Sequence, residues 1–263
     1  ELGVSQEVWS WRGPSSISPF SPCAASRVGH IFSAARLQPD DVLYDLGCGD
    51  GRVLHEAAVR YGVQCLGLEI DADCVDEARR RSAALGTEVE SCCEWGLADL
   101  LALPNGFLTD RERRLPGSET PLRTPPPTVV ILFLTGHGLA RMAEWLHGEY
   151  RRSQGAFRII TCVESLDECV DYTQASLFSD RNEHGWEVYR GDAARFGVYV
   201  VPPLGQTPAE WAAAAPERSP ADAAAADAPS APAPVVFPGL LSADDIADVE
   251  ALAQEMMAEQ GGL

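Results

Sequence analysis

Apolar and polar residues follow two different periods along this chain, and the period changes several times between residues 24 and 201. Helical spacing of the apolar residues predicts helices at residues 24–35, 52–61, 73–85 and 138–152. Short apolar runs bounded by turn residues predict strands at residues 42–45, 64–69, 87–92, 128–134 and 157–163. Strands that alternate with helices are typical of a parallel sheet, because each helix returns the chain to the same end of the sheet.

The apolar run at residues 128–134 has no polar interruption after its first threonine. Such a run is expected for a central parallel strand that is covered on both faces. Two later segments, residues 186–190 and 195–201, predict a closing antiparallel pair and bring the total to seven strands. The predicted fold is therefore α/β, a Rossmann-like doubly wound sheet that is mostly parallel and ends in an antiparallel pair.

The composition divides the chain into four regions. Residues 1–22, rich in Ser, Pro and Trp, predict an irregular arm, and residues 23–203 predict the folded domain. Within that domain, residues 104–127 contain six prolines and a charged run, which predicts a surface insertion before the fourth strand. Residues 204–234 are rich in Ala, Pro and acidic residues and predict a disordered linker, while residues 235–263 predict a C-terminal helical segment.

The chain of 263 residues has a formal charge of −19, and all 20 of its basic residues are arginine. Nucleic acid is a disfavoured partner, because affinity for phosphates comes from neutralising them with cations. The same charge favours a basic protein substrate. No stretch has the roughly 20 apolar residues needed to span a bilayer, and the N-terminus shows no secretory signal, so a cytoplasmic location is expected.

The eight cysteines and five histidines show no metal-ligand spacing. There is no CxxC pair, and the cysteines do not cluster with the histidines. We expect buried reduced thiols, no disulfides and no metal site.

The strongest chemical signal is Asp-Leu-Gly-Cys-Gly-Asp-Gly at residues 45–51, directly after a predicted strand and before a predicted helix. Glycines allow the backbone to turn sharply and to approach a ligand closely. The fingerprint G-x-G-x-x-G of nicotinamide enzymes would need a third glycine at position 52, where Arg52 stands. The third glycine is Gly51, one position early, so a nicotinamide enzyme is the disfavoured alternative.

This segment resembles motif I of class I S-adenosylmethionine-dependent methyltransferases. The resemblance implies S-adenosylmethionine as the cofactor, with its amino-acid end held by an acid and a G-x-G-x-G turn. The residues carried over are Asp45, Gly47, Cys48, Gly49 and Gly51.

Two further acids follow predicted strands. Glu69 ends the second strand, and an acid at this position can accept hydrogen bonds from both ribose hydroxyls. By itself it could also be a solvent-facing acid, but its spacing from the glycine loop favours ribose binding. Asp99 follows the third strand, where the resemblance implies contact with the adenine amino group; a helix N-cap is the alternative.

The resemblance narrows to one subgroup through Ser-Pro-Phe-Ser-Pro at residues 18–22, followed by a helix and by Tyr-Asp-Leu-Gly-Cys-Gly-Asp-Gly-Arg at residues 44–52. That subgroup includes lysine methyltransferases that act on mitochondrial carriers and on the ATP synthase c subunit. The resemblance to this subgroup implies a lysine side chain of a protein as the methyl acceptor. It also implies a mitochondrial location as the alternative to a cytoplasmic one. The [DN]-P-P-[YFW] tetrapeptide of adenine methyltransferases is missing after the fourth strand.

His137 follows that strand, where an acceptor would approach the methyl group, and is the weak catalytic candidate. A turn histidine with a local hydrogen bond is the favoured interpretation. Two other functions stay open: a small-molecule methyltransferase, and a binding or scaffold protein that keeps the fold without turnover.

Overall fold

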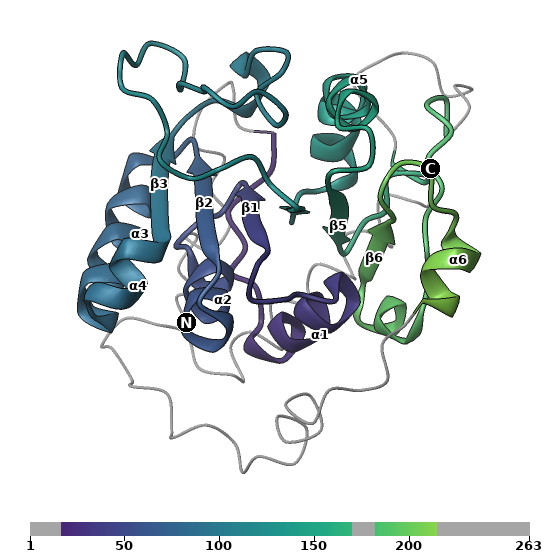
Figure 1. Cartoon of the computed structure of the whole chain (residues 1–263), viewed down its shortest axis with the longest axis horizontal. Coiled ribbons are helices and arrows are strands. Elements are labelled where there is room, and N and C mark those ends of the chain that lie inside the picture. Colours follow the sequence, from purple (N-terminus) through teal and green to yellow (C-terminus); the bar gives the residue numbers. More distant parts are fainter. Residues whose placement is uncertain (1–16, 170–181, 215–263) are drawn as a thin grey trace, which may run out of the picture. The chain divides into compact units, whose positions relative to one another are not determined.

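The structure, a computed structural model, describes residues 17–169 and 182–214. In these residues a single sheet has six strands in the order β3-β2-β1-β4-β5-β6 (Figure 1). Strands β1 to β5 are parallel, and β6 is antiparallel to β5. The strands are β1 (Val42–Leu46), β2 (Gln64–Glu69), β3 (Cys93–Leu97), β4 (Val129–Leu132), β5 (Arg158–Cys162) and β6 (Val198–Val201). The predicted fold class is confirmed.

Helices cover both faces of this sheet, because side chains along each strand point alternately to opposite faces. Leu43 belongs to the apolar cluster under α1 and α2, whereas Tyr44 and Leu46 belong to the cluster under α5. The helices are α1 (Ala25–Ala35), α2 (Arg52–Tyr61), α3 (Ala72–Leu85), α4 (Thr87–Cys92), α5 (Gly136–Arg152) and α6 (Pro208–Ala213), with 3-10 turns η1 (Leu100–Ala102) and η2 (Asp192–Phe196). No helix in the described residues is long and apolar enough to cross a membrane.

The order of the strands positions the site. The chain runs outward from β1 through β2 to β3, and then crosses to β4 on the other side of β1. The loops after β1 and β4 therefore leave in opposite directions, which opens a crevice at the carboxyl ends of these strands.

The prediction of a strand at residues 87–92 is wrong, because these residues form the helix α4. Only Val89 of its six residues is buried, so a strand here would bring polar side chains into the sheet. Glu88 and Glu90 lie in the first turn, where the partial positive charge of a helix N-terminus favours acids. The third strand begins instead at Cys93, which pairs with Cys65 of β2.

The C-terminal part of the sheet is narrower than predicted. Residues 186–190 form no strand, and Tyr189 makes an isolated antiparallel bridge to Val200 of β6. Residues 208–213 of the predicted linker form the helix α6, which Thr207 caps and in which Trp211 is buried. The rest of the predicted linker, from residue 215, lies outside the described residues. The C-terminal helical segment predicted over residues 235–263 also lies outside the described residues.

The proline-rich insertion is not confined to the surface. Phe107 and Leu108 are each 1% exposed and belong to the apolar cluster under α5. The fully buried carboxylate of Glu149, on α5, accepts hydrogen bonds from the amides of Gly106 at 2.6 Å and Leu108 at 2.8 Å. Buried amides need such acceptors, so Glu149 anchors the insertion to the domain.

We expect Glu149→Ala to lower the free energy of unfolding by about 3 kcal/mol, because it leaves two buried amides without an acceptor. Urea denaturation followed by circular dichroism measures this change. Glu144→Ala is the matched control, since Glu144 is an exposed glutamate on the same helix. Equal stability of the two variants would contradict an anchoring role for Glu149.

Candidate active site

The glycine loop connects β1 to α2 at the carboxyl edge of the sheet. Gly49 has a φ of +52°, and a Cβ atom there would lie 2.5 Å from the ring of Phe20. Gly51 has a φ of +77° and faces Trp95, on the side of the loop toward α3. A positive φ favours glycine at both positions. The missing side chain leaves room for Phe20 at Gly49 and for Trp95 at Gly51.

Glu69, the last residue of β2, joins this loop to its own strand end. Its Oε2 accepts a hydrogen bond from the Gly49 amide at 2.9 Å. Its Oε1 accepts bonds from the amides of Ile70 at 2.8 Å and Asp71 at 3.2 Å. The carboxylate is therefore held in one orientation at the edge of the loop, and its oxygens keep lone pairs for further donors.

Asp45 is a buried acid of the site, and the pKa of its carboxyl is strongly raised. It is 3% exposed, and within the described residues its Oδ1 has no hydrogen-bond partner. Burial raises the pKa of this carboxyl to about 7, and the nearby charges of Glu69 and Asp50 add to the effect. An unpaired buried oxygen is costly, and a cationic donor beside it would remove that cost.

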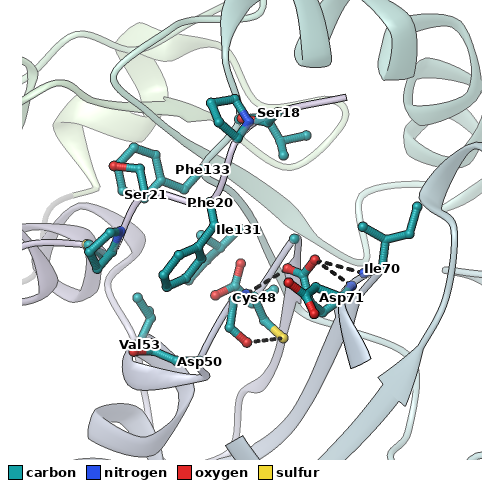
Figure 2. A pocket seen from close by; sticks show the side chains of 18 of the residues that line it. Ser18, Phe20, Ser21, Cys48, Asp50, Val53, Ile70, Asp71, Ile131 and Phe133 are labelled. Carbon is teal, nitrogen blue, oxygen red and sulfur yellow. Dashed lines mark hydrogen bonds between the residues drawn. The ribbon is translucent and has the colours of Figure 1, made fainter. Parts of the chain in front are cut away.

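A pocket brings most of the predicted residues together (Figure 2). Asp45, Gly47, Cys48, Gly49, Glu69 and Asp99 all line it. Gly51 and His137 do not. Gly51 is turned toward Trp95, and His137 lies in the first turn of α5.

Asp99 has a local structural role, and Cys48 is chemically quiet. Asp99 caps η1, where its carboxylate accepts a hydrogen bond from the Leu101 amide at 2.9 Å. Cys48 is buried, and burial raises the pKa of its thiol well above the ordinary value. A thiol of this kind stays neutral and is a poor nucleophile.

Sequence reasoning missed the part that the N-terminal arm plays in this pocket. Ser18, Phe20 and Cys23 line it, together with Phe133, which follows β4. Figure 2 shows Phe20 and Phe133 on one side of the pocket and Asp71 on the other. The Ser-Pro-Phe-Ser-Pro segment at residues 18–22 carried the signal, but the hydrophobic pattern assigned it to an irregular arm.

An ion-pair network fixes the arm to the loop. Asp50 is 6% exposed and binds Arg52 at 2.6 Å and Arg81 at 2.8 Å. Arg52 also donates to the carbonyl of Cys23 at 3.2 Å. These two arginines hold the pKa of the Asp50 carboxyl below its ordinary value despite its burial, so Asp50 stays charged beside Asp45.

The chemistry of the lining suits an organic cation better than a metal. Among the described residues, no group of three or more His, Cys, Asp or Glu side chains is placed to hold a metal ion. The site offers carboxylate oxygens from Asp45 and Glu69, backbone at Gly49, and the aromatic rings of Phe20 and Phe133.

Comparisons with known proteins give two partial sequence matches. A family model described as mycolic acid cyclopropane synthetase matches residues 22–96, which include the glycine loop and Glu69. A protein-lysine N-methyltransferase from Saccharolobus islandicus (strain REY15A) is 38% identical over 61 residues. That match covers 23% of this chain and 38% of the relative, so the chain spans well under two thirds of the relative's length. Together the two matches support a class I S-adenosylmethionine-dependent methyltransferase fold.

Two solved structures are similar to this chain. An RNA methyltransferase from Salinibacter ruber, in complex with S-adenosyl-L-homocysteine, has a TM-score of 0.46 at 21% identity and covers 69% of this chain and 94% of its own. A SAM-dependent methyltransferase from Geobacter sulfurreducens, also in complex with S-adenosyl-L-homocysteine, has a TM-score of 0.40 at 18% identity. The coverage there is 54% of this chain and 49% of the other.

The raised pKa of Asp45 predicts a pH dependence of stability. Between the ordinary pKa of 3.8 and about 7, the folded protein keeps a proton that the unfolded chain has lost. The free energy of unfolding therefore falls as the pH rises through this window, by up to about 4 kcal/mol. Asp45→Asn removes this contribution, so the stability of the variant relative to wild type increases across the window.

Urea denaturation at intervals from pH 4 to pH 8 measures this difference. Asp76→Asn, an exposed aspartate on α3, is the matched control and should keep the wild-type profile. Parallel profiles for Asp45→Asn and wild type would show that Asp45 is not the titrating group.

Proposed function

We propose that this chain is a methyltransferase that binds S-adenosylmethionine between the glycine loop and Glu69. The observation that carries this proposal is the buried, unpaired Oδ1 of Asp45 in a pocket that also holds Gly49 and the fixed carboxylate of Glu69. S-adenosylmethionine has an ammonium group, ribose hydroxyls and an adenine ring, and the site offers a partner to each of them.

Each acid of the site would bind a different part of S-adenosylmethionine. Asp45 accepts a hydrogen bond from the ammonium group, and Glu69 accepts from the ribose hydroxyls. Asp99 stands on the adenine side, as the resemblance to the family implies. The bound cofactor supplies a methyl group on a sulfonium, which is a strong electrophile, so the protein chiefly positions the acceptor and excludes water.

The electrostatics of the pocket favour a cationic ligand. Burial raises the pKa of Asp45, and the nearby charges of Glu69 and Asp50 raise it further. Asp50 is itself paired with Arg52 and Arg81. An ammonium beside Asp45 would restore the ionised carboxylate, because a neighbouring opposite charge favours the charged form. Binding of the cofactor near neutral pH would thus release a proton.

For the acceptor we propose a lysine side chain of a protein. The subgroup resemblance supports this choice, and so does the partial match to a protein-lysine N-methyltransferase. The formal charge of −19 would also attract a basic substrate. A small-molecule acceptor is the second candidate, favoured by the match of residues 22–96 to the model of mycolic acid cyclopropane synthetase.

Methyl-labelled S-adenosylmethionine tests these proposals. The protein is incubated with the labelled cofactor and a cell lysate, separated afterwards into protein and small-molecule fractions. We expect label in protein, recovered as methyl-lysine after hydrolysis, and at least a tenfold loss of label with Asp45→Asn. Asp76→Asn serves as the matched control.

Each other outcome selects a different function. Label only in the small-molecule fraction would overturn the lysine acceptor and favour the second candidate. Binding of S-adenosylmethionine without transfer to either fraction would contradict a methyltransferase and favour a scaffold protein.

A further inference from the structure

The backbone directly after β5 is strained, at the carboxyl edge of the sheet. Val163 follows this strand with a φ of +71°, which is rare for a β-branched residue, and its side chain is 42% exposed. Its amide donates to the carbonyl of Gly197 at 2.6 Å, which holds the conformation. Strain of this kind persists where the surroundings impose it, and it concentrates at functional sites.

This backbone turn places Glu164 at the start of α5. The carboxyl group of Glu164 lies 3.6 Å from the position that a Cβ atom on Gly136 would take. Gly136 begins α5, directly after the β4 end at which Phe133 and Leu134 line the pocket. β4 and β5 are neighbouring parallel strands, so Glu164 stands at the same carboxyl edge as the pocket.

Glu164 has no hydrogen bond or ion pair in the described part of the chain, although it is only partly exposed. In the same segment, Asp167 and Glu168 both bind Arg190, at 2.8 Å and 3.0 Å. A partly buried carboxylate that has no ion-pair partner among the described residues can pair with a cation from outside the chain.

We propose that Glu164 binds the cationic amine of the methyl acceptor and so selects an ammonium-bearing substrate. This inference rests on the proposed methyltransferase function and adds a substrate-selecting residue to it. β4 lies between β1, which leads into the glycine loop, and β5, which leads to Glu164. We therefore expect Glu164 to contact an acceptor that enters beside Phe133, and not the cofactor.

The acceptor ammonium that Glu164 would bind must lose a proton before its nitrogen can attack the methyl group. Burial, followed by the charge of Glu168, raises the pKa of the Glu164 carboxyl above its ordinary value. The acceptor ammonium gives one proton to solvent, and its nitrogen lone pair then forms the bond to the methyl carbon. The electron pair of the broken carbon–sulfur bond stays on sulfur, which leaves S-adenosylhomocysteine and a methylammonium.

The test uses the whole chain and a library of peptides that each carry one central lysine. Methyl transfer from saturating S-adenosylmethionine is measured for wild type, Glu164→Gln, Glu164→Asp and Glu144→Gln. Glu144→Gln is the matched control, because Glu144 is an exposed glutamate on α5. Calorimetry gives the Kd of S-adenosylmethionine for each protein.

We expect Glu164→Gln to raise KM for the peptides about tenfold, because an amide replaces a charged partner of the ammonium. The conservative Glu164→Asp should recover part of this loss, and the Kd of S-adenosylmethionine should stay within twofold in all variants. An unchanged KM in Glu164→Gln, or an equal rise in Glu144→Gln, would overturn the inference. A wild type that binds S-adenosylmethionine but modifies none of the lysine peptides would overturn it as well, whereas a folded wild type without cofactor affinity would overturn the proposed function itself.

Discussion

One hydrogen bond holds the two sides of the site together: the Gly49 amide donates to the Glu69 carboxylate at 2.9 Å. β1 and β2 are parallel neighbours, so the loop after β1 and the last residue of β2 meet at the same edge of the sheet. The amides of Ile70 and Asp71 hold the other oxygen of Glu69. The pocket between the loop and the strand end therefore has a fixed carboxylate before any ligand arrives, which lowers the entropy cost of binding.

At the same edge of the sheet, the buried carboxyl of Asp45 lowers the stability of the protein, and a bound cation would remove this cost. Asp45 is buried with one unpaired oxygen, and its pKa is raised to about 7, while Asp50 beside it stays ionised through Arg52 and Arg81. An apolar side chain at this position would avoid the cost of the buried carboxyl. A bound ammonium would pair with the carboxylate of Asp45, so the same residue would connect the stability of the protein with the proposed binding of the cofactor.

Short-range signals in the sequence were enough for the centre of the fold. The bounds of α2 and β2 match the prediction, since a glycine turn and the apolar periods determine them locally. Long-range contacts decided the rest. Glu149 binds an insertion about 40 residues earlier, and Phe20 reaches the pocket from a segment with no periodic pattern. Residues 87–92 became a helix because their polar side chains had no place in a sheet that is covered on both faces.

Calorimetric titration of S-adenosylmethionine into wild type, Glu69→Gln and Glu88→Gln is the most direct test of the central claim. Glu88 is an exposed glutamate on α4 and gives the matched control. We expect binding by wild type and by Glu88→Gln with equal Kd, and an affinity at least about tenfold weaker for Glu69→Gln, because the amide loses charge-assisted bonds to the ribose hydroxyls. Equal affinity of all three proteins, or no binding by folded wild type, would contradict a cofactor site between the glycine loop and Glu69.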